Sequence, residues 1–261
     1  MLVVEGASDE EVLGELCVHG TQQVFAAGNR ELVEQLMRHI RSEPIDGCDC
    51  LYLIDCDSYG KTPDLCEAAD LVVSETCDLE SDLVRLGAAE RLAKRFASSD
   101  SDARGLVNRA CALSLPLSIV RRAAFRCSVS MRRRGHQFRM ADFSDLQLST
   151  WDEATPTEGE VLESVASELG WPAPTQEQVE NALPQIPRDF DRTTLGKDAI
   201  DALFWLLKRE GKGEVRGWNL AFFYKAVAGE LRLDDLDRWE VGRRFKAWES
   251  ASGHTLMKSE S

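Results

Sequence analysis

The chain has 261 residues, of which 43% are hydrophobic and 29% charged, and its formal net charge at pH 7 is -14. This length and composition are typical of one large globular domain, or of one domain with a substantial second lobe. No apolar stretch approaches the roughly 20 residues that a membrane span requires, and no basic segment of a secretory signal is present, so we expect a cytoplasmic protein without a membrane partner.

The first hundred residues alternate short apolar runs with helical spacing. Strands are expected at 2–5, 24–27, 49–54 and 71–73. Helices are expected at 9–18, 30–41, 63–68 and 78–97, with Ser8 capping the first and Thr76 the last. Strands separated by helices of this length imply right-handed crossovers. Residues 1–100 are therefore expected to form an α/β domain whose parallel sheet is flanked by helices.

The remainder, residues 101–261, is expected to form a second, mainly helical domain. Helical spacing recurs at 104–127, with a bend at Pro116, and again near 158–169, 175–183, 197–210, 217–230 and 234–250. One strand is expected at 137–143, and residues 184–191 have the composition of a linker.

Acidic residues directly follow two of the expected strands. Glu5 follows Leu2-Val3-Val4, and Asp55 and Asp57 follow the run from Leu51 to Ile54. Because ligands of open α/β sheets bind at the carboxyl ends of the strands, these three carboxylates are expected at one sheet edge. They would repel one another unless a hard cation lay among them. The sequence thus predicts a divalent-metal site, with phosphate-ester chemistry as its use.

Positive charge is concentrated in one segment of this acidic chain. Residues 104–139 hold nine arginines and no aspartate or glutamate. Such a segment is a candidate phosphate-contacting surface. The alternative is that its arginines pair with the protein's own carboxylates or with an acidic partner. The candidates for nucleic-acid contact are Arg121, Arg122, Arg126, Arg132, Arg133 and Arg134.

The eight cysteines favour reduced thiols, because nothing in the sequence indicates secretion. Cys48, Cys50 and Cys56 cluster in sequence but lack the matching distal pair of a zinc site. We expect them to act as small buried hydrophobic residues.

Two segments resemble the motifs of the TOPRIM core, which topoisomerases, bacterial primases, small RNA-maturing nucleases and OLD-type nucleases share. They are Val3-Val4-Glu5-Gly6-x-Ser8-Asp9 and Leu53-Ile54-Asp55-Cys56-Asp57. This resemblance covers about residues 1–97. The segment Glu75-Thr76-Cys77-Asp78-Leu79-Glu80 is similar to an acidic patch of OLD-type nucleases. The arginine-rich helices and Thr194-Leu195-Gly196-Lys197-Asp198-Ala199 resemble TOPRIM-like effectors of the PARIS type, which accompany ABC- or AAA-type ATPases in anti-phage defence.

The resemblance implies a nuclease that uses Mg²⁺, for which Mn²⁺ can substitute. Glu5 would be a metal ligand or the base that takes a proton from the attacking water, and Asp55 and Asp57 would bind the metal. Asp78 and Glu80 would provide a second metal position.

Two further residues receive supporting roles from the resemblance. Asp9 would assist from one helical turn below Glu5, and Lys197 would stabilise charge on the scissile phosphate. The implied partners are a nucleic-acid substrate, an ATPase and further copies of this chain. Whether the substrate is DNA or RNA stays open.

Other functions also fit parts of the sequence. A haloacid-dehalogenase-like phosphatase shares the Asp-x-Asp, but this chain continues with Ser58-Tyr59-Gly60 where that family requires a threonine. A topoisomerase is disfavoured because the chain has only three tyrosines and Tyr52 lies inside an expected strand. A non-catalytic subunit that binds an ATPase is the main alternative.

Overall fold

The computed structural model describes residues 1–18, 20–45, 47–56, 68–97, 99–132, 157–162, 176–189, 193–210 and 213–258. The chain divides into two compact units: Met1–Leu92 together with Trp218–Ser261, and Ala93–Gly217. The first boundary lies near the expected one. The expected second domain, 101–261, differs from this division, because its last part packs with the first unit.

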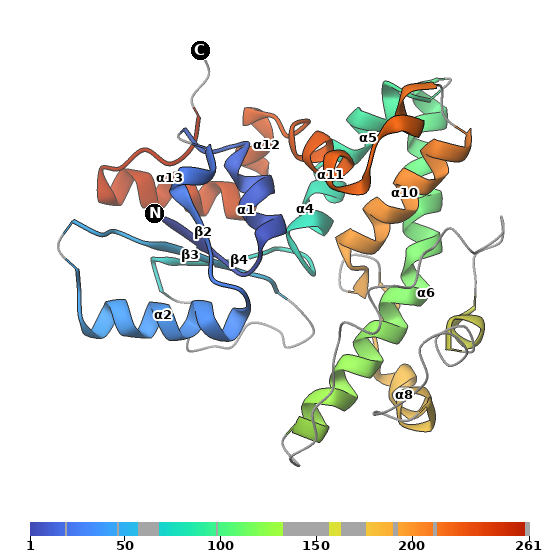
Figure 1. Ribbon diagram of the computed structural model, residues 1–261, viewed down its shortest axis with the longest axis horizontal. Coiled ribbons are helices and arrows are strands. Elements are labelled where there is room, and N and C mark those ends of the chain that lie inside the picture. The colour runs from blue at the N-terminus through green and yellow to red at the C-terminus, as the bar shows by residue number, and fades with distance from the viewer. Residues whose placement is uncertain are drawn as a thin grey trace. The chain divides into compact units, whose positions relative to one another are not determined.

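A four-stranded, all-parallel sheet forms the centre of the first unit (Figure 1). Its strands are β1 (Leu2–Val4), β2 (Val24–Ala26), β3 (Leu51–Ile54) and β4 (Leu71–Val73). The strand order is β2-β1-β3-β4. In this register Leu2 pairs with both Val24 and Leu51. The prediction of an α/β protein with a parallel sheet flanked by helices is confirmed.

Alternating strand residues supply the two faces of the sheet. Val3, Tyr52 and Ile54 pack with Val33 and Met37 of α2 (Arg30–Ser42). The helices α1 (Ala7–Gly14) and α13 (Glu240–Ser252) lie on the opposite face (Figure 1). The sheet therefore lies between two helical layers. Because all four strands run in the same direction, their carboxyl ends lie at the same edge of the sheet.

Two helix boundaries differ from expectation for local reasons. The helix α1 begins at Ala7, and the Asp9 carboxylate, rather than the Ser8 hydroxyl, accepts from Gly6 N–H at 2.9 Å. The expected helix 78–97 is two helices, α4 (Leu79–Arg85) and α5 (Ala88–Lys94). Gly87 separates them with a φ of 82°, a left-handed conformation that glycine adopts without steric cost.

The C-terminal segment completes the first unit with α11 (Leu220–Ala228), α12 (Leu233–Arg238) and α13. The expected helix 234–250 is thus two helices that meet at Trp239. The amide of Val18 donates to Leu256 O and that of Lys258 to Leu16 O, each at 2.9 Å. Arg244 of α13 donates to the backbone oxygens of residues 68 and 71, at 2.8 and 2.9 Å. These bonds tie the end of the chain to the sheet domain.

The second unit is helical in its described residues, with α6 (Asp100–Arg132), α8 (Gln176–Ala182) and α10 (Gly196–Glu210). The helix α6 continues through Pro116. Arg109 pairs with Glu210 at 2.8 Å and Arg121 with Asp198 at 3.2 Å, so α6 and α10 run antiparallel. Residues 158–162 are also helical.

Two expected elements, the helix at 63–68 and the strand at 137–143, lie wholly or mostly outside the described residues. Among the helices that the structure describes, none is both long and apolar enough to cross a membrane.

The close crossing of α12 and α13 gives a test of this fold. A Cβ on Gly242 would lie 2.4 Å from Leu236 O, so Gly242→Ala forces the two helices apart. We expect a loss of about 1–3 kcal/mol in the free energy of unfolding, measured by urea denaturation. The matched control is Gly105→Ala in α6, where a Cβ meets nothing within 4 Å and helix propensity favours alanine. Equal stability of the two variants would contradict the close approach of α12 and α13 at Gly242.

Candidate metal site at the carboxyl edge of the sheet

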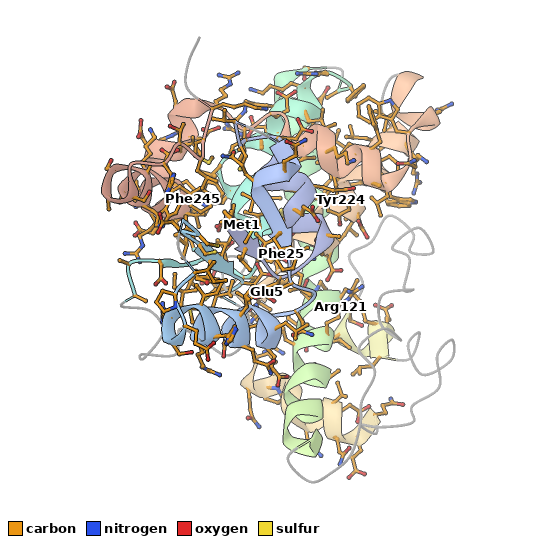
Figure 2. The ribbon with its side chains drawn as sticks, turned by 60° about the vertical axis from the view of Figure 1, so that its left-hand side comes forward. Met1, Glu5, Phe25, Arg121, Tyr224 and Phe245 are labelled. Atoms are coloured by element: carbon orange, nitrogen blue, oxygen red, sulfur yellow. The ribbon has the colours of Figure 1, made fainter. Side chains whose placement is uncertain are left out.

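Glu5 and Asp55 meet where β1 and β3 end. The Glu5 carboxylate (Oε1) accepts from the Asp55 amide at 2.9 Å. Met1 and Glu5 mark the two ends of β1, and Glu5 stands at the end from which the chain enters α1 (Figure 2). Parallel pairing of β1 with β3 places both residues at the same edge. The structure therefore brings these two predicted ligands together.

The segment that follows β4 is hydrogen-bonded to the end of β3. Ser74 accepts from Cys56 N–H at 2.7 Å through its hydroxyl and donates its own amide to Ile54 O at 3.0 Å. Leu79 N–H, at the start of α4, donates to the Asp55 carboxylate at 3.3 Å. Three successive strand ends thus converge through hydrogen bonds between side chains and backbone.

Asp78 ends the loop after β4 and Glu80 is the second residue of α4, and both side chains are buried. Asp78 is the N-cap of α4 and accepts from Ser81 N–H at 2.7 Å, so Asp78, and not Thr76, caps the helix. Glu80 has no exposed surface, and Asp78 is 4% exposed. The charge of an acidic residue in the first turn of a helix is favourable, but full burial of a carboxylate is costly. Helix capping alone therefore accounts for Asp78 but not for Glu80.

The pKa of Asp55 shows the effect of the acidic residues around it. Burial raises the pKa of its carboxyl well above the ordinary value, and the negative charges of Asp9, Asp78, Glu5 and Glu80 raise it further, in that order. Part of the residue's surface stays accessible although protein atoms surround the carboxyl. Four acidic side chains therefore act on Asp55, and their charges oppose its ionised form.

This donor set is chemically suited to a hard divalent cation, because it consists of carboxylate oxygens whose repulsion a doubly charged ion would offset. Among the described residues, no group of three or more His, Cys, Asp or Glu is arranged to hold a metal ion. Asp57, which the sequence predicts as a ligand beside Asp55, lies outside the described residues. The suitability of these residues for a divalent cation therefore rests on their carboxylate chemistry and their negative charge.

Lys197 is exposed and is the second residue of α10, in the second unit. The other predicted residues of this site that the structure describes belong to the first unit.

Two of the predicted nucleic-acid contacts have structural partners inside the second unit. Arg122 is 7% exposed and donates to Thr193 O at 2.9 Å. Arg121 pairs with Asp198, which also accepts from the Ser118 hydroxyl at 3.0 Å. The Arg121–Asp198 pair is of the kind that the alternative expects, in which the arginines pair with the protein's own carboxylates, whereas Arg122 binds a backbone oxygen. Arg126 and Arg132 lie on α6, and Arg133 and Arg134 lie outside the described residues.

Asp82 is a buried acidic residue that sequence reasoning passed over. It accepts from the amides of Glu75 and Thr76 at 3.1 and 2.9 Å, and from the Thr76 hydroxyl at 2.6 Å. Trp239 Nε1–H donates to it at 2.8 Å. Burial raises the pKa of Asp82 to about 6, although the hydrogen bonds from Thr76 and Trp239 lower it. Its position four residues after Asp78 was visible, but its partner at residue 239 was not.

Comparison of this chain with protein-family models, with curated proteins and with solved structures finds no match.

The raised pKa of Asp55 predicts a pH dependence of stability in the metal-free protein. Since this pKa is higher in the folded protein than in the unfolded chain, the folded state binds more protons between the two values. The free energy of unfolding should therefore rise as the pH falls through the folded pKa of Asp55, and the shift of Asp82 to about 6 acts in the same direction as the pH falls below neutral. Thermal unfolding in EDTA measures it.

Asp55→Asn isolates the contribution of this group, because the amide keeps the shape and removes the charge. We expect the variant to melt roughly 2–4 °C above the unsubstituted protein at pH 7.5, as about 1 kcal/mol would give, with a smaller gain at pH 5. Glu43→Gln, at the exposed residue that follows α2, is the control and should change stability by less than about 0.5 kcal/mol. A loss of stability at pH 7.5 in Asp55→Asn would show that the charge is not unfavourable there.

Proposed function

We propose that this protein is a metal-dependent nuclease of the TOPRIM kind, which hydrolyses phosphodiester bonds in DNA or RNA with Mg²⁺. The single observation that carries the proposal is that Glu5 and Asp55 meet at two strand ends, while burial and the acidic neighbours, Glu80 of α4 among them, raise the pKa of Asp55. A protein that buries such mutually repelling groups loses stability unless a ligand compensates. A divalent cation is the ligand that fits an all-carboxylate set.

The chain's own residues would divide the work. Asp55 and Glu80, with Asp57 and Asp78, would hold the metal, and Mg²⁺ when bound supplies Lewis-acid stabilisation of the phosphoryl oxygens. Glu5 accepts from Asp55 N–H and would act either as a further ligand or as the base that takes the proton of the attacking water. Asp9 supports this geometry by holding the Gly6 amide directly after Glu5.

The remaining parts of the proposal rest on the family resemblance. The arginine-rich segment and Lys197 would engage the phosphate backbone, since phosphate contacts position a nucleic acid without reading its sequence. An ABC- or AAA-type ATPase would control the nuclease in anti-phage defence, within the cytoplasm, and copies of the chain would assemble with it. A non-catalytic subunit of such a complex is what remains if no cleavage is found.

Charge-removing substitutions test the site directly. Glu5→Gln, Asp55→Asn and Glu80→Gln should each lower the cleavage rate of plasmid, single-stranded DNA or tRNA at least 100-fold in Mg²⁺, and EDTA should abolish cleavage. The matched control is Glu43→Gln, at an exposed residue that ends α2, which should cleave like the unsubstituted protein. Cleavage that survives all three site substitutions would remove the proposed centre, and cleavage of none of these substrates by the unsubstituted protein would favour the non-catalytic alternative.

The role of the arginine segment is tested by salt dependence. Changing the three arginines of residues 132–134 to glutamate should weaken nucleic-acid binding and flatten the plot of log affinity against log salt by up to ~0.9 per lost phosphate contact. The control changes three surface arginines elsewhere, Arg38, Arg188 and Arg216, to glutamate, with the same effect on net charge. If both triple variants behave alike, the segment makes no specific contact.

A further inference from the structure

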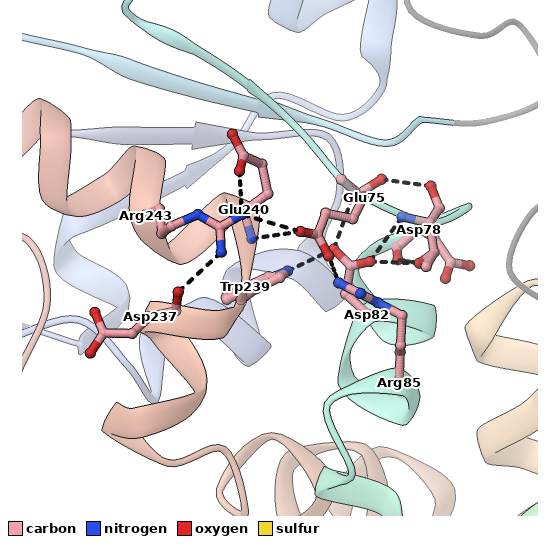
Figure 3. Close-up of polar contacts among 10 residues, drawn as sticks. Glu75, Asp78, Asp82, Arg85, Asp237, Trp239, Glu240 and Arg243 are labelled. Carbon is pink, nitrogen blue, oxygen red and sulfur yellow. Dashed lines mark hydrogen bonds and ion pairs between the residues drawn. The ribbon is translucent and has the colours of Figure 1, made fainter.

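A network of hydrogen bonds and ion pairs links the acidic loop after β4 to the C-terminal helices (Figure 3). Its centre is Asp82 on α4, which has no exposed surface. Two donors to Asp82 belong to Thr76 and one is the amide of Glu75, so the loop folds back on its own helix. The remaining donor is Trp239 Nε1–H, which comes from the connection between α12 and α13, 157 residues further along the chain.

A second link runs in parallel with the first. The Glu75 carboxylate accepts from the Glu240 amide at 2.8 Å, at the first residue of α13. The same carboxylate pairs with Arg85 of α4 and lies 3.9 Å from Arg243 of α13. The loop is therefore held from α4 on one side and from α13 on the other.

The proposed ligands lie within this held segment. Asp78 and Glu80 fall between the anchors at Glu75 and Asp82, and Leu79 N–H is the group that reaches the Asp55 carboxylate. A shift of the loop would therefore move Asp78 and Glu80 relative to Asp55. Trp239 itself is fully buried and packs edge-on against Phe245 at 6.2 Å, so its ring is fixed by the core.

We infer that Trp239 is a positioning residue for the acidic site: through Asp82 it holds residues 74–82, the loop after β4 and the first turn of α4, so that Asp78 and Glu80 face Asp55. This inference rests on the proposed metal-dependent function. It assigns the C-terminal helices a part in a site whose proposed ligands all come from the first 80 residues. Groups that orient metal ligands without touching the metal commonly affect metal affinity 10- to 100-fold.

The test compares Trp239→Phe, which keeps an aromatic ring but removes the N–H donor, with Trp248→Phe as the matched control. Trp248 lies on α13, the helix that directly follows Trp239, and stacks on His254. Glu75→Ala is the second variant, at a partly exposed position, and breaks the parallel link without opening the core. Mg²⁺ affinity is measured by calorimetry in the full-length chain. Hydrogen exchange of residues 74–82 is followed in the metal-free protein and corrected for each variant's stability.

We expect Trp239→Phe and Glu75→Ala to bind Mg²⁺ ~10-fold more weakly and to exchange faster in residues 74–82, while Trp248→Phe matches the unsubstituted protein. Unchanged exchange in both variants, or unchanged affinity in a protein that binds Mg²⁺, overturns the inference. If the unsubstituted protein takes up no Mg²⁺, the proposed function fails instead, and the exchange data still decide whether Trp239 holds the loop.

Discussion

Mutual repulsion among buried carboxylates is the constraint on which the rest of the structure depends. Parallel strands deliver Glu5, Asp55 and the acidic loop after β4 to one sheet edge, and burial then strengthens every charge interaction there. The fold holds these groups with directed bonds, from Asp55 N–H to Glu5 and from Leu79 N–H to Asp55. Buried carboxylates that destabilise one another are characteristic of functional sites, because a core with only a structural role rarely contains them.

Two buried aspartates of one domain show how environment separates structure from function. Asp82 is enclosed by N–H and O–H donors from three residues, and this solvation by the protein limits the rise of its pKa to about 6. Asp55 is surrounded by further carboxylates, whose charges add to the effect of burial. Two aspartates less than thirty residues apart therefore differ in their surroundings: hydrogen-bond donors offset the charge of Asp82, whereas the carboxylates around Asp55 oppose its charge.

Local pattern was enough to predict the sheet and the edge at which Glu5 and Asp55 meet. Short apolar runs that end at an acidic residue or a turn, and that alternate with helices, predict a parallel sheet. All four expected strands lie within a residue or two of the observed ones. The break at Gly87 and the capping by Asp78 depend on backbone geometry that propensity does not resolve. The return of α12 and α13 to the sheet, and with it the bond from Trp239 to Asp82, depends on packing between distant segments and left no signal in the sequence.

The most direct test of the central claim, that a divalent cation offsets the repulsion at the sheet edge, is a crystal structure with Mn²⁺ and its anomalous scattering. The account predicts an anomalous peak at the carboxyl ends of β1 and β3, with carboxylate oxygens of Asp55 and Glu80 about 2.0–2.2 Å from the ion. A well-ordered acidic edge without such a peak, or a peak only elsewhere on the molecule, would contradict the account.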